Sequence, residues 1–243
     1  MRNERFLSLF IIKSLEKMSK KFSNSKHHHG WTEEKVEKFV EDMEDLIEYR
    51  YTPFAHKIAS FINLEMKKPA PTILDVGCGP GFLLFELRKL LPEIRLIGLD
   101  SSDLMLDAAK KKARTKQDKE IEFKKGFAEN LPFTDNSIDY IVSQNSLHDF
   151  KDVNESLIQI YRVLVHGGMF LDKSRNGGYP KWKQKLKFIQ IALRFGLREA
   201  KMVFKGEEKW LNPTDNLRMM ENVGFEANLL ENGFEYMIRG RKR

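Results

Sequence analysis

Residues 75–81 have the residue types and spacing of a ligand-binding turn, because glycines occupy alternate positions in Asp-Val-Gly-Cys-Gly-Pro-Gly. A hydrophobic run precedes this segment and a run with helical periodicity follows it, which predicts a strand, a tight turn and a helix. Glycine lets the main chain turn sharply and lets a ligand approach the backbone closely. We therefore expect a nucleotide-type ligand to bind at this turn.

The spacing of the glycines separates this turn from two other nucleotide sites. A dinucleotide fingerprint has its third glycine one place later, where this sequence has Phe82. A phosphate-binding P-loop has a Gly-Lys-Ser or Gly-Lys-Thr triplet, which this sequence lacks. The positions of Gly77, Gly79 and Gly81 therefore favour a ligand with an amino-acid tail over a pyrophosphate.

A second carboxylate supports the same site. Asp100 lies 19 residues after Gly81, at the end of the second predicted strand. A carboxylate at this place can accept charge-assisted hydrogen bonds from both hydroxyls of a ribose. Capping of the next helix is compatible with that role, because Ser101 or Ser102 could provide the cap.

From residue 72 onward, short β-rich runs alternate with amphipathic helices, which is typical of a parallel sheet with right-handed crossovers. The predicted strands are 72–76, 94–99, 120–124, 138–143, 168–172, 225–230 and 234–239. The predicted helices between them are 81–91, 103–115, 153–164, 182–195 and 213–222. The pair Asn232-Gly233 indicates a hairpin between the last two strands. We expect a doubly wound, Rossmann-like α/β fold whose seven-stranded sheet is mostly parallel, with an antiparallel C-terminal hairpin strand.

The helical and mixed parts of the chain meet at residues 67–71. Pro69 and Pro71 end any helix there, because proline removes a backbone donor. We interpret residues 1–70 as an N-terminal helical cap region. Residues 71–243 are then the α/β core, with a helical insertion at about 176–212.

The composition limits the possible partners and the cellular location of the protein. The formal charge of 42 − 35 = +7 and the pI near 9.3 suit nucleic acid, anionic lipid or an acidic substrate, but also an ordinary solvated surface. No apolar run approaches the roughly 20 residues that span a bilayer, although the apolar stripe in 6–18 leaves peripheral membrane contact open. The single cysteine, Cys78, cannot form an internal disulfide, which favours the cytoplasm. Residues 27–29 are three histidines without acidic or cysteine partners at ligand spacing, so we expect no metal site.

Four segments occur in an order that is more specific than any one of them. They are 73–81, the acidic end of the second strand at Asp100, 126–133 and 161–168. In these segments the sequence resembles the class I S-adenosylmethionine-dependent methyltransferases, especially the branch that includes enzymes of ubiquinone and menaquinone biosynthesis. The resemblance covers roughly residues 50–243.

The resemblance implies S-adenosyl-L-methionine as the cofactor and S-adenosyl-L-homocysteine as its product. In that family the glycine turn holds the methionine part, the acidic residue holds the ribose, and the third segment flanks the adenine. The cofactor-binding residues expected on this basis are Asp75, Gly77, Cys78, Gly79, Gly81, Asp100, Ser101, Ala128, Glu129, Gln144 and Asn145. Phe127 is a departure, because relatives often have Asp there; the backbone around Ala128 or the ring itself is then expected to meet the base.

The end of the fourth predicted strand, 143–150, is expected to face the methyl group, because ligands of open α/β sheets bind at that edge. Methyl transfer from a sulfonium depends mainly on positioning, and it needs a base only if the acceptor must lose a proton. His148 is the candidate base, although a polar residue that merely closes the loop would have the same position. The expected acceptor pocket contains Tyr49, Tyr51, Asn145, His148 and Tyr179.

We therefore expect a methyltransferase of the EC 2.1.1 class that acts on a small molecule. Segment 143–150 lacks the Asn/Asp-Pro-Pro-Tyr set of adenine-N6 enzymes, and Cys78 is badly placed to be the nucleophile of a cytosine-C5 enzyme. An RNA or protein methyltransferase, hinted at by the basic charge, stays an alternative, as does a cofactor-binding protein without catalysis. The acceptor atom and the oligomeric state are left open.

Overall fold

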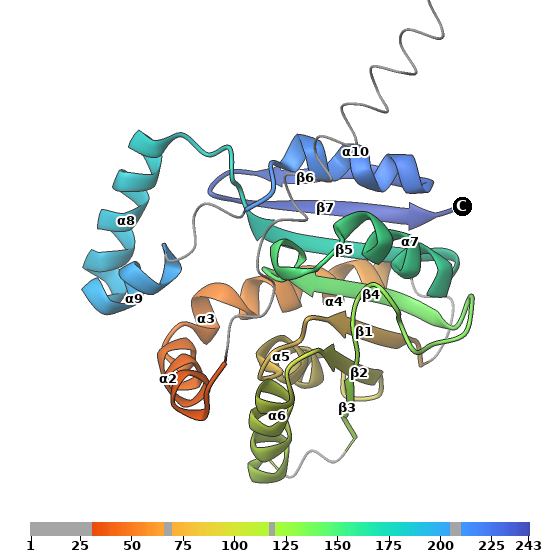
Figure 1. Ribbon diagram of the computed structural model, residues 1–243, viewed down its shortest axis with the longest axis horizontal. Coiled ribbons are helices and arrows are strands. Elements are labelled where there is room, and N and C mark those ends of the chain that lie inside the picture. Colours follow the sequence, from red (N-terminus) through yellow and green to blue (C-terminus); the bar gives the residue numbers. More distant parts are fainter. Residues whose placement is uncertain (1–30, 66–69, 117–119, 205–209) are drawn as a thin grey trace, which may run out of the picture.

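The computed structural model describes residues 31–65, 70–116, 120–204 and 210–243 (Figure 1). In this part of the chain, seven strands form one mixed sheet in the order β3-β2-β1-β4-β5-β7-β6. The strands are β1 (Thr72–Val76), β2 (Arg95–Asp100), β3 (Glu122–Lys125), β4 (Ile138–Gln144), β5 (Leu164–Arg175), β6 (Phe225–Asn232) and β7 (Glu235–Lys242). β7 runs opposite to the other six strands, and Gly233 closes its hairpin with β6. The predicted fold class is confirmed.

Helices cover both faces of the sheet, because each strand alternates apolar side chains between two cores. One core contains α4 (Thr52–Glu65), α5 (Phe82–Leu90) and α6 (Asp103–Thr115). The other contains α7 (Val153–Val163) and α10 (Pro213–Val223). The carboxyl ends of β1, β2, β4 and β5 lie at one edge of the sheet, where ligands of such folds bind.

A third apolar cluster lies beyond that edge and joins two helical segments that are far apart in the sequence. The first segment is α2 (Glu33–Glu44) and α3 (Ile47–Arg50), and the second is α8 (Lys181–Phe195) and α9 (Leu197–Val203) (Figure 1). An ion pair between Arg198 and Asp42 ties α9 to α2. Segments 6–18 and 27–29 lie outside the described residues, and the division of the chain at residue 70 stays a prediction.

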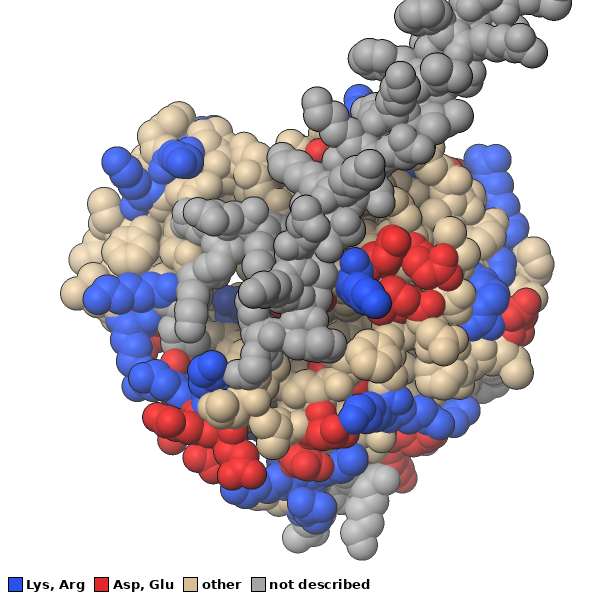
Figure 2. Space-filling model, viewed as in Figure 1, with Lys and Arg blue, Asp and Glu red and all other residues tan. Residues whose placement is uncertain are grey.

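Within the described ranges, every helix is too short or too polar to cross a bilayer. Figure 2 shows Lys and Arg side chains spread around the molecule, with Asp and Glu side chains among them. The net charge of +7 therefore forms no single basic field on this face.

β4, β5, β6 and β7 are all longer than the sequence predicted, and β5 differs most. β5 begins at Leu164 and ends at Arg175, rather than covering 168–172, because it pairs with β7 as far as Arg175 opposite Glu235. Gly167 accommodates the irregular start of β5 with φ of +77°. The basic C-terminal segment likewise continues β7 to Lys242, whose side chain is buried and donates hydrogen bonds to three acceptors.

A buried polar network joins β5, β7 and α10. Asp172 Oδ1 accepts a hydrogen bond from Ser174 Oγ at 2.9 Å, and its Oδ2 accepts one from Asn216 Nδ2 at 2.8 Å. Asn216 Nδ2 also donates to the hydroxyl of Tyr236 at 3.0 Å. All four side chains are buried. Burial raises the pKa of Asp172 to about 7, although these hydrogen bonds oppose the shift.

Asp172→Asn is expected to flatten the pH dependence of stability. Because the pKa of Asp172 is higher in the folded protein than in the unfolded chain, its contribution to stability is complete below about pH 4 and is lost as the pH rises to about 7. Relative to the variant, the wild type should lose at most about 1.4 kcal/mol of unfolding free energy per pH unit in this window. Urea unfolding between pH 4 and pH 8 measures the difference, with exposed Asp107→Asn as the control. Equal slopes in the wild type and Asp172→Asn would contradict the prediction.

Candidate functional site

Residues 75–81, here called the glycine turn, connect β1 to α5 in a backbone conformation that favours glycine. Gly77, Gly79 and Gly81 have φ values of +77°, +52° and +78°. The amides of Gly77 and Cys78 donate to the carbonyl oxygen of Leu99 at 2.8 and 3.0 Å. The turn is therefore bound to the end of β2.

The first two glycines of the turn have different surroundings. A Cβ at Gly77 would lie 2.4 Å from Ser146 Cβ, so the turn packs directly against the loop after β4. Ser146 Oγ fixes that contact by donating to the carbonyl oxygen of Val76 at 2.9 Å. A Cβ at Gly79 would instead meet no described atom within 4 Å. The backbone at Gly79 thus faces open space.

Asp100 links the glycine turn to the start of α6. Its Oδ2 accepts the N–H of Gly79 at 2.8 Å, and its Oδ1 accepts the N–H of Ser102 at 2.9 Å. Burial raises the pKa of Asp100, while these backbone donors oppose the shift. Ser102, not Ser101, caps α6 by accepting the amide of Met105, and Ser101 is exposed beside Asp100.

Asp75 and Cys78 are buried inside the turn. Burial, together with the negative charge of Asp100, raises the pKa of Asp75 to about 8. Burial also raises the pKa of the Cys78 thiol. A Cβ at Gly98 would lie 2.8 Å from Cys78 Sγ, which shows that this thiol packs closely against β2. Cys78 therefore has the surroundings of a packing residue.

The segment after β3 lies beside the same edge, because the amide of Gly126 donates to the backbone oxygen of Asp100 at 3.1 Å. Ala128 is buried. Glu129 Oε1 accepts the N–H of Asp152 at 3.0 Å, so this oxygen holds the residue before α7. The side chain of Phe127 is 48% exposed.

The end of β4 carries two buried amide oxygens. Gln144 Nε2 donates to the carbonyl oxygen of Arg50 at 2.6 Å, and the backbone of Asn145 has φ of +55°. Gln144 Oε1 and Asn145 Oδ1 are buried and have no hydrogen-bond partner among the described residues. A buried acceptor without a donor costs about 1–3 kcal/mol, so such groups mark a place for a ligand or water.

His148 lies in the short helix η1 (Leu147–Asp149) that follows β4. Its ring stacks on Trp210 with 3.8 Å between centroids, and its Nε2 lies 3.3 Å from Asp149 Oδ2. The same indole lies 5.2 Å from the guanidinium of Arg175 at the end of β5. Arg175 is buried, also faces the rings of Phe204 and Phe234, and donates to the carbonyl oxygen of Val203.

The three tyrosines expected in the acceptor pocket all belong to the apolar cluster beyond the sheet edge. Tyr179 lies 5.8 Å from Phe234 and is thus linked to His148 through the rings around Arg175. Tyr51 lies 5.3 Å from Phe82. Burial raises the pKa of the Tyr51 hydroxyl; the positive charge of Arg50 opposes this shift and the negative charge of Asp75 adds to it. Tyr49 instead packs on Phe195 of α8 at 5.2 Å.

The sequence analysis does not identify two residues of this site, Trp210 and Arg175. Trp210 falls within the predicted insertion at about 176–212, and nothing in the local pattern pairs it with His148. The predicted fifth strand ends at residue 172, whereas β5 continues to Arg175. The available sequence signal is an arginine shortly after the apolar run of a strand.

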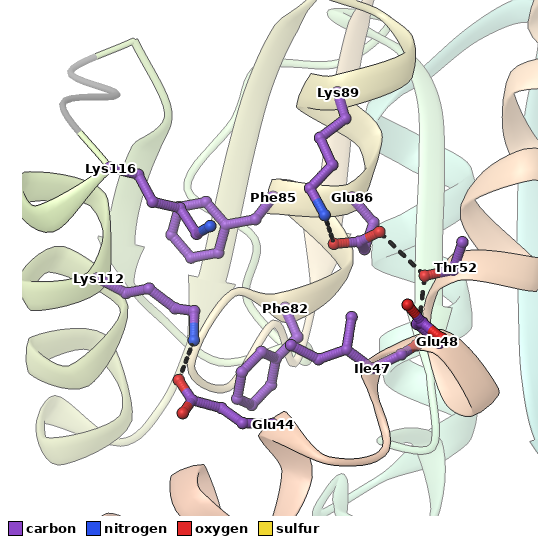
Figure 3. A pocket seen from close by; sticks show the side chains of 10 residues that line it. All are labelled: Glu44, Ile47, Glu48, Thr52, Phe82, Phe85, Glu86, Lys89, Lys112 and Lys116. Carbon is purple, nitrogen blue, oxygen red and sulfur yellow. Dashed lines mark hydrogen bonds and ion pairs between the residues drawn. The ribbon is translucent and has the colours of Figure 1, made fainter.

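A groove of about 780 Å³ lies elsewhere, between the N-terminal helices and α5 with α6 (Figure 3). Lys112 crosses it, 2.5 Å from Glu44 and 4.6 Å from the ring of Phe82. On its other side Thr52 Oγ1 donates to Glu86 Oε2 at 2.9 Å. None of the predicted site residues lines this groove, whose paired charges hold the N-terminal helices against the core.

Known proteins resemble this chain over most of its length. Residues 67–210 match a family model described as Methyltransferase domain. The demethylmenaquinone methyltransferase of Symbiobacterium thermophilum is 29% identical over 228 residues, which are 85% of this chain and 91% of that protein. The protein of the same name from Listeria welshimeri is 30% identical over 216 residues, which are 84% and 89% of the two chains.

Solved structures share the fold. A putative S-adenosylmethionine-dependent methyltransferase from Methanococcus maripaludis has a TM-score of 0.67 and 23% identity, covering 90% of this chain and 96% of that one. An S-adenosylmethionine-dependent methyltransferase from Aquifex aeolicus has a TM-score of 0.64 and 19% identity, covering 86% and 98%. The family model spans more than half of the chain, and the resemblance inferred from the sequence is confirmed. The chain is an enzyme that belongs to the class I S-adenosylmethionine-dependent methyltransferases, close to the branch that contains the demethylmenaquinone methyltransferases.

Proposed function

We propose that this enzyme moves a methyl group from S-adenosyl-L-methionine to a small aromatic or quinone-like molecule at the carboxyl edge of the sheet. One juxtaposition carries the proposal. The open backbone at Gly79 is hydrogen-bonded to the half-buried carboxylate of Asp100, the buried Asp75 lies at the start of the same turn, and the end of β4 adds the buried amide oxygens of Gln144 and Asn145. Together these groups offer space, negative charge and acceptors to a ligand with cationic and hydroxyl groups.

Asp100 is the residue that we assign to the ribose. Each of its oxygens accepts one backbone N–H, which leaves lone pairs for the two hydroxyls. The methionine part would lie along Gly79, and the amide oxygens after β4 would accept from its amino group. Ala128 and Glu129 would flank the adenine, through the backbone rather than through Glu129 Oε1, which already accepts from Asp152.

The residues around His148 are suited to positioning an acceptor and taking its proton. Bound S-adenosylmethionine supplies a methyl group that is already activated by its sulfonium. The stack on Trp210 fixes the plane of the His148 ring, and the Asp149 carboxylate at 3.3 Å would stabilise that ring once it has accepted a proton. Tyr51 and Tyr179 are half-buried among aromatic rings and would pack on a flat acceptor.

The names of the relatives support a small-molecule acceptor, since demethylmenaquinone methyltransferases match most of the chain. The alternatives, RNA and protein, have the net basic charge as their only support, and Figure 2 shows that charge interspersed with acidic side chains. We also propose that the enzyme acts in the cytoplasm, because its one cysteine is a buried thiol.

Asp100→Asn is expected to weaken binding of S-adenosylmethionine by roughly 10- to 100-fold, because a charge-assisted hydrogen bond is lost and a backbone acceptor is altered. Isothermal titration calorimetry measures this change. Exposed Asp107→Asn in α6 is the matched control and should bind like the wild type. If the wild type itself fails to bind S-adenosylmethionine, the cofactor assignment is wrong.

His148→Gln is expected to lower kcat by roughly 100-fold or more, because the general base is removed, while S-adenosylmethionine affinity stays unchanged. The assay follows S-adenosylhomocysteine formation with demethylmenaquinone, the acceptor in the relatives' names, and with a small-metabolite extract. His56→Gln, an exposed substitution in α4, serves as the control. An unchanged rate in His148→Gln would disprove the role as base, and turnover with bulk RNA alone would disprove the acceptor class.

A further inference from the structure

The outer face of α8 carries a stripe of exposed apolar side chains. Trp182, Leu186, Ile189 and Leu193 are 62%, 59%, 53% and 84% exposed. They recur at i, i+4, i+7 and i+11, so they share one face of the helix. Leu197, at the start of α9, is also exposed. Single exposed apolar residues are ordinary on a protein surface, but an aligned row of this kind marks a contact surface.

The opposite face of α8 already has its partners. Ile191 is buried, Phe188 packs on Phe204 with 5.5 Å between rings, and Phe195 packs on Tyr49 at 5.2 Å. The stripe therefore does not belong to any of the apolar clusters that the described residues form. Since the inner face fixes the rotation of the helix, the stripe is held pointing outward.

Basic side chains border the stripe on both sides. α8 contains Lys181, Lys183, Lys185, Lys187 and Arg194 and no acidic residue. At 100° per residue, Lys181 and Lys185 lie along one border, and the other three lie along the opposite border. Figure 2 shows Lys and Arg side chains with uncharged surface between them where α8 lies in Figure 1.

This pattern fits an anionic lipid surface better than other partners. Three of the four side chains in the stripe are aliphatic, which partition into hydrocarbon but do not stack on nucleic-acid bases. The basic borders complement the negative charge of anionic headgroups. A helix of 15 residues is about 22 Å long, which suits it to lie in the plane of the interface.

We propose that α8 is a peripheral membrane-docking surface, with Trp182, Leu186, Ile189 and Leu193 entering the headgroup region of an anionic bilayer and the flanking lysines meeting its phosphates. This inference is independent of the acceptor proposed above. It places the membrane on the helix whose inner face covers the aromatic cluster beyond the sheet edge.

Flotation of the full-length protein with vesicles tests the proposal. The wild type should float with vesicles of phosphatidylcholine containing phosphatidylglycerol at about 0.1 M salt, and much less with pure phosphatidylcholine. Combining Leu186→Gln, Ile189→Gln and Leu193→Gln should lower the bound fraction about tenfold or more, because withdrawing even one leucine side chain from water is worth about a tenfold change in partition. Leu64→Gln with Ile158→Gln, two exposed apolar positions on other helices, should float like the wild type.

Charge and fold are checked separately. Lys181→Gln, Lys183→Gln and Lys185→Gln together should abolish the preference for anionic vesicles, and circular dichroism should show every variant folded. Two vesicle results would overturn the proposal: a wild type that stays at the bottom of the gradient, or a triple glutamine variant that still floats. A wild-type dimer that the same variant converts to a monomer, without vesicle binding, would assign the stripe to a second copy instead.

Discussion

The end of β2 is the point on which the rest of the site depends. The backbone oxygen of Leu99 receives two amides of the glycine turn, and the carboxylate of Asp100 receives a third. The same carboxylate accepts the amide of Ser102 at the start of α6, and the backbone oxygen of Asp100 receives the amide of Gly126. Two adjacent residues thus hold three loops in register. In each of these five hydrogen bonds the donor is a backbone amide.

That arrangement places negative charge where the surroundings do not favour it. Burial raises the pKa of both Asp75 and Asp100, and the negative charge of Asp100 further disfavours ionisation of Asp75. Strain of this kind is tolerated where a ligand relieves it, and a positively charged ligand would do so. Gln144 Oε1 and Asn145 Oδ1 are uncharged but are also in unfavourable surroundings, because they are buried and accept no hydrogen bond from the described residues.

Local patterns were sufficient to predict most of the fold, because its helices and strands alternate regularly and are bounded by glycine, proline or capping residues. The positions of Gly79 and Asp100 could be found for the same reason, since each lies next to the end of a buried strand. The length of β5 could not be predicted, because β7 stabilises its last residues from 60 or more positions away. The stack of Trp210 on His148 joins parts of the chain that share no local pattern, and only the tertiary structure brings them together. Ser102 rather than Ser101 caps α6, a one-residue choice that depends on backbone angles.

The position of β7 has a consequence for how the protein is made. This strand lies between β5 and β6, although it is the last of the seven along the chain. Its buried Lys242 donates to Asn136 Oδ1 at 2.8 Å and to the backbone oxygens of Arg162 and Leu164. Until residues 235–242 have left the ribosome, β5 has an open edge and β6 has no partner in the sheet. The second half of the sheet therefore closes only after β7 has been made, and a nascent chain arrested before β7 exposes an edge on which another chain can pair.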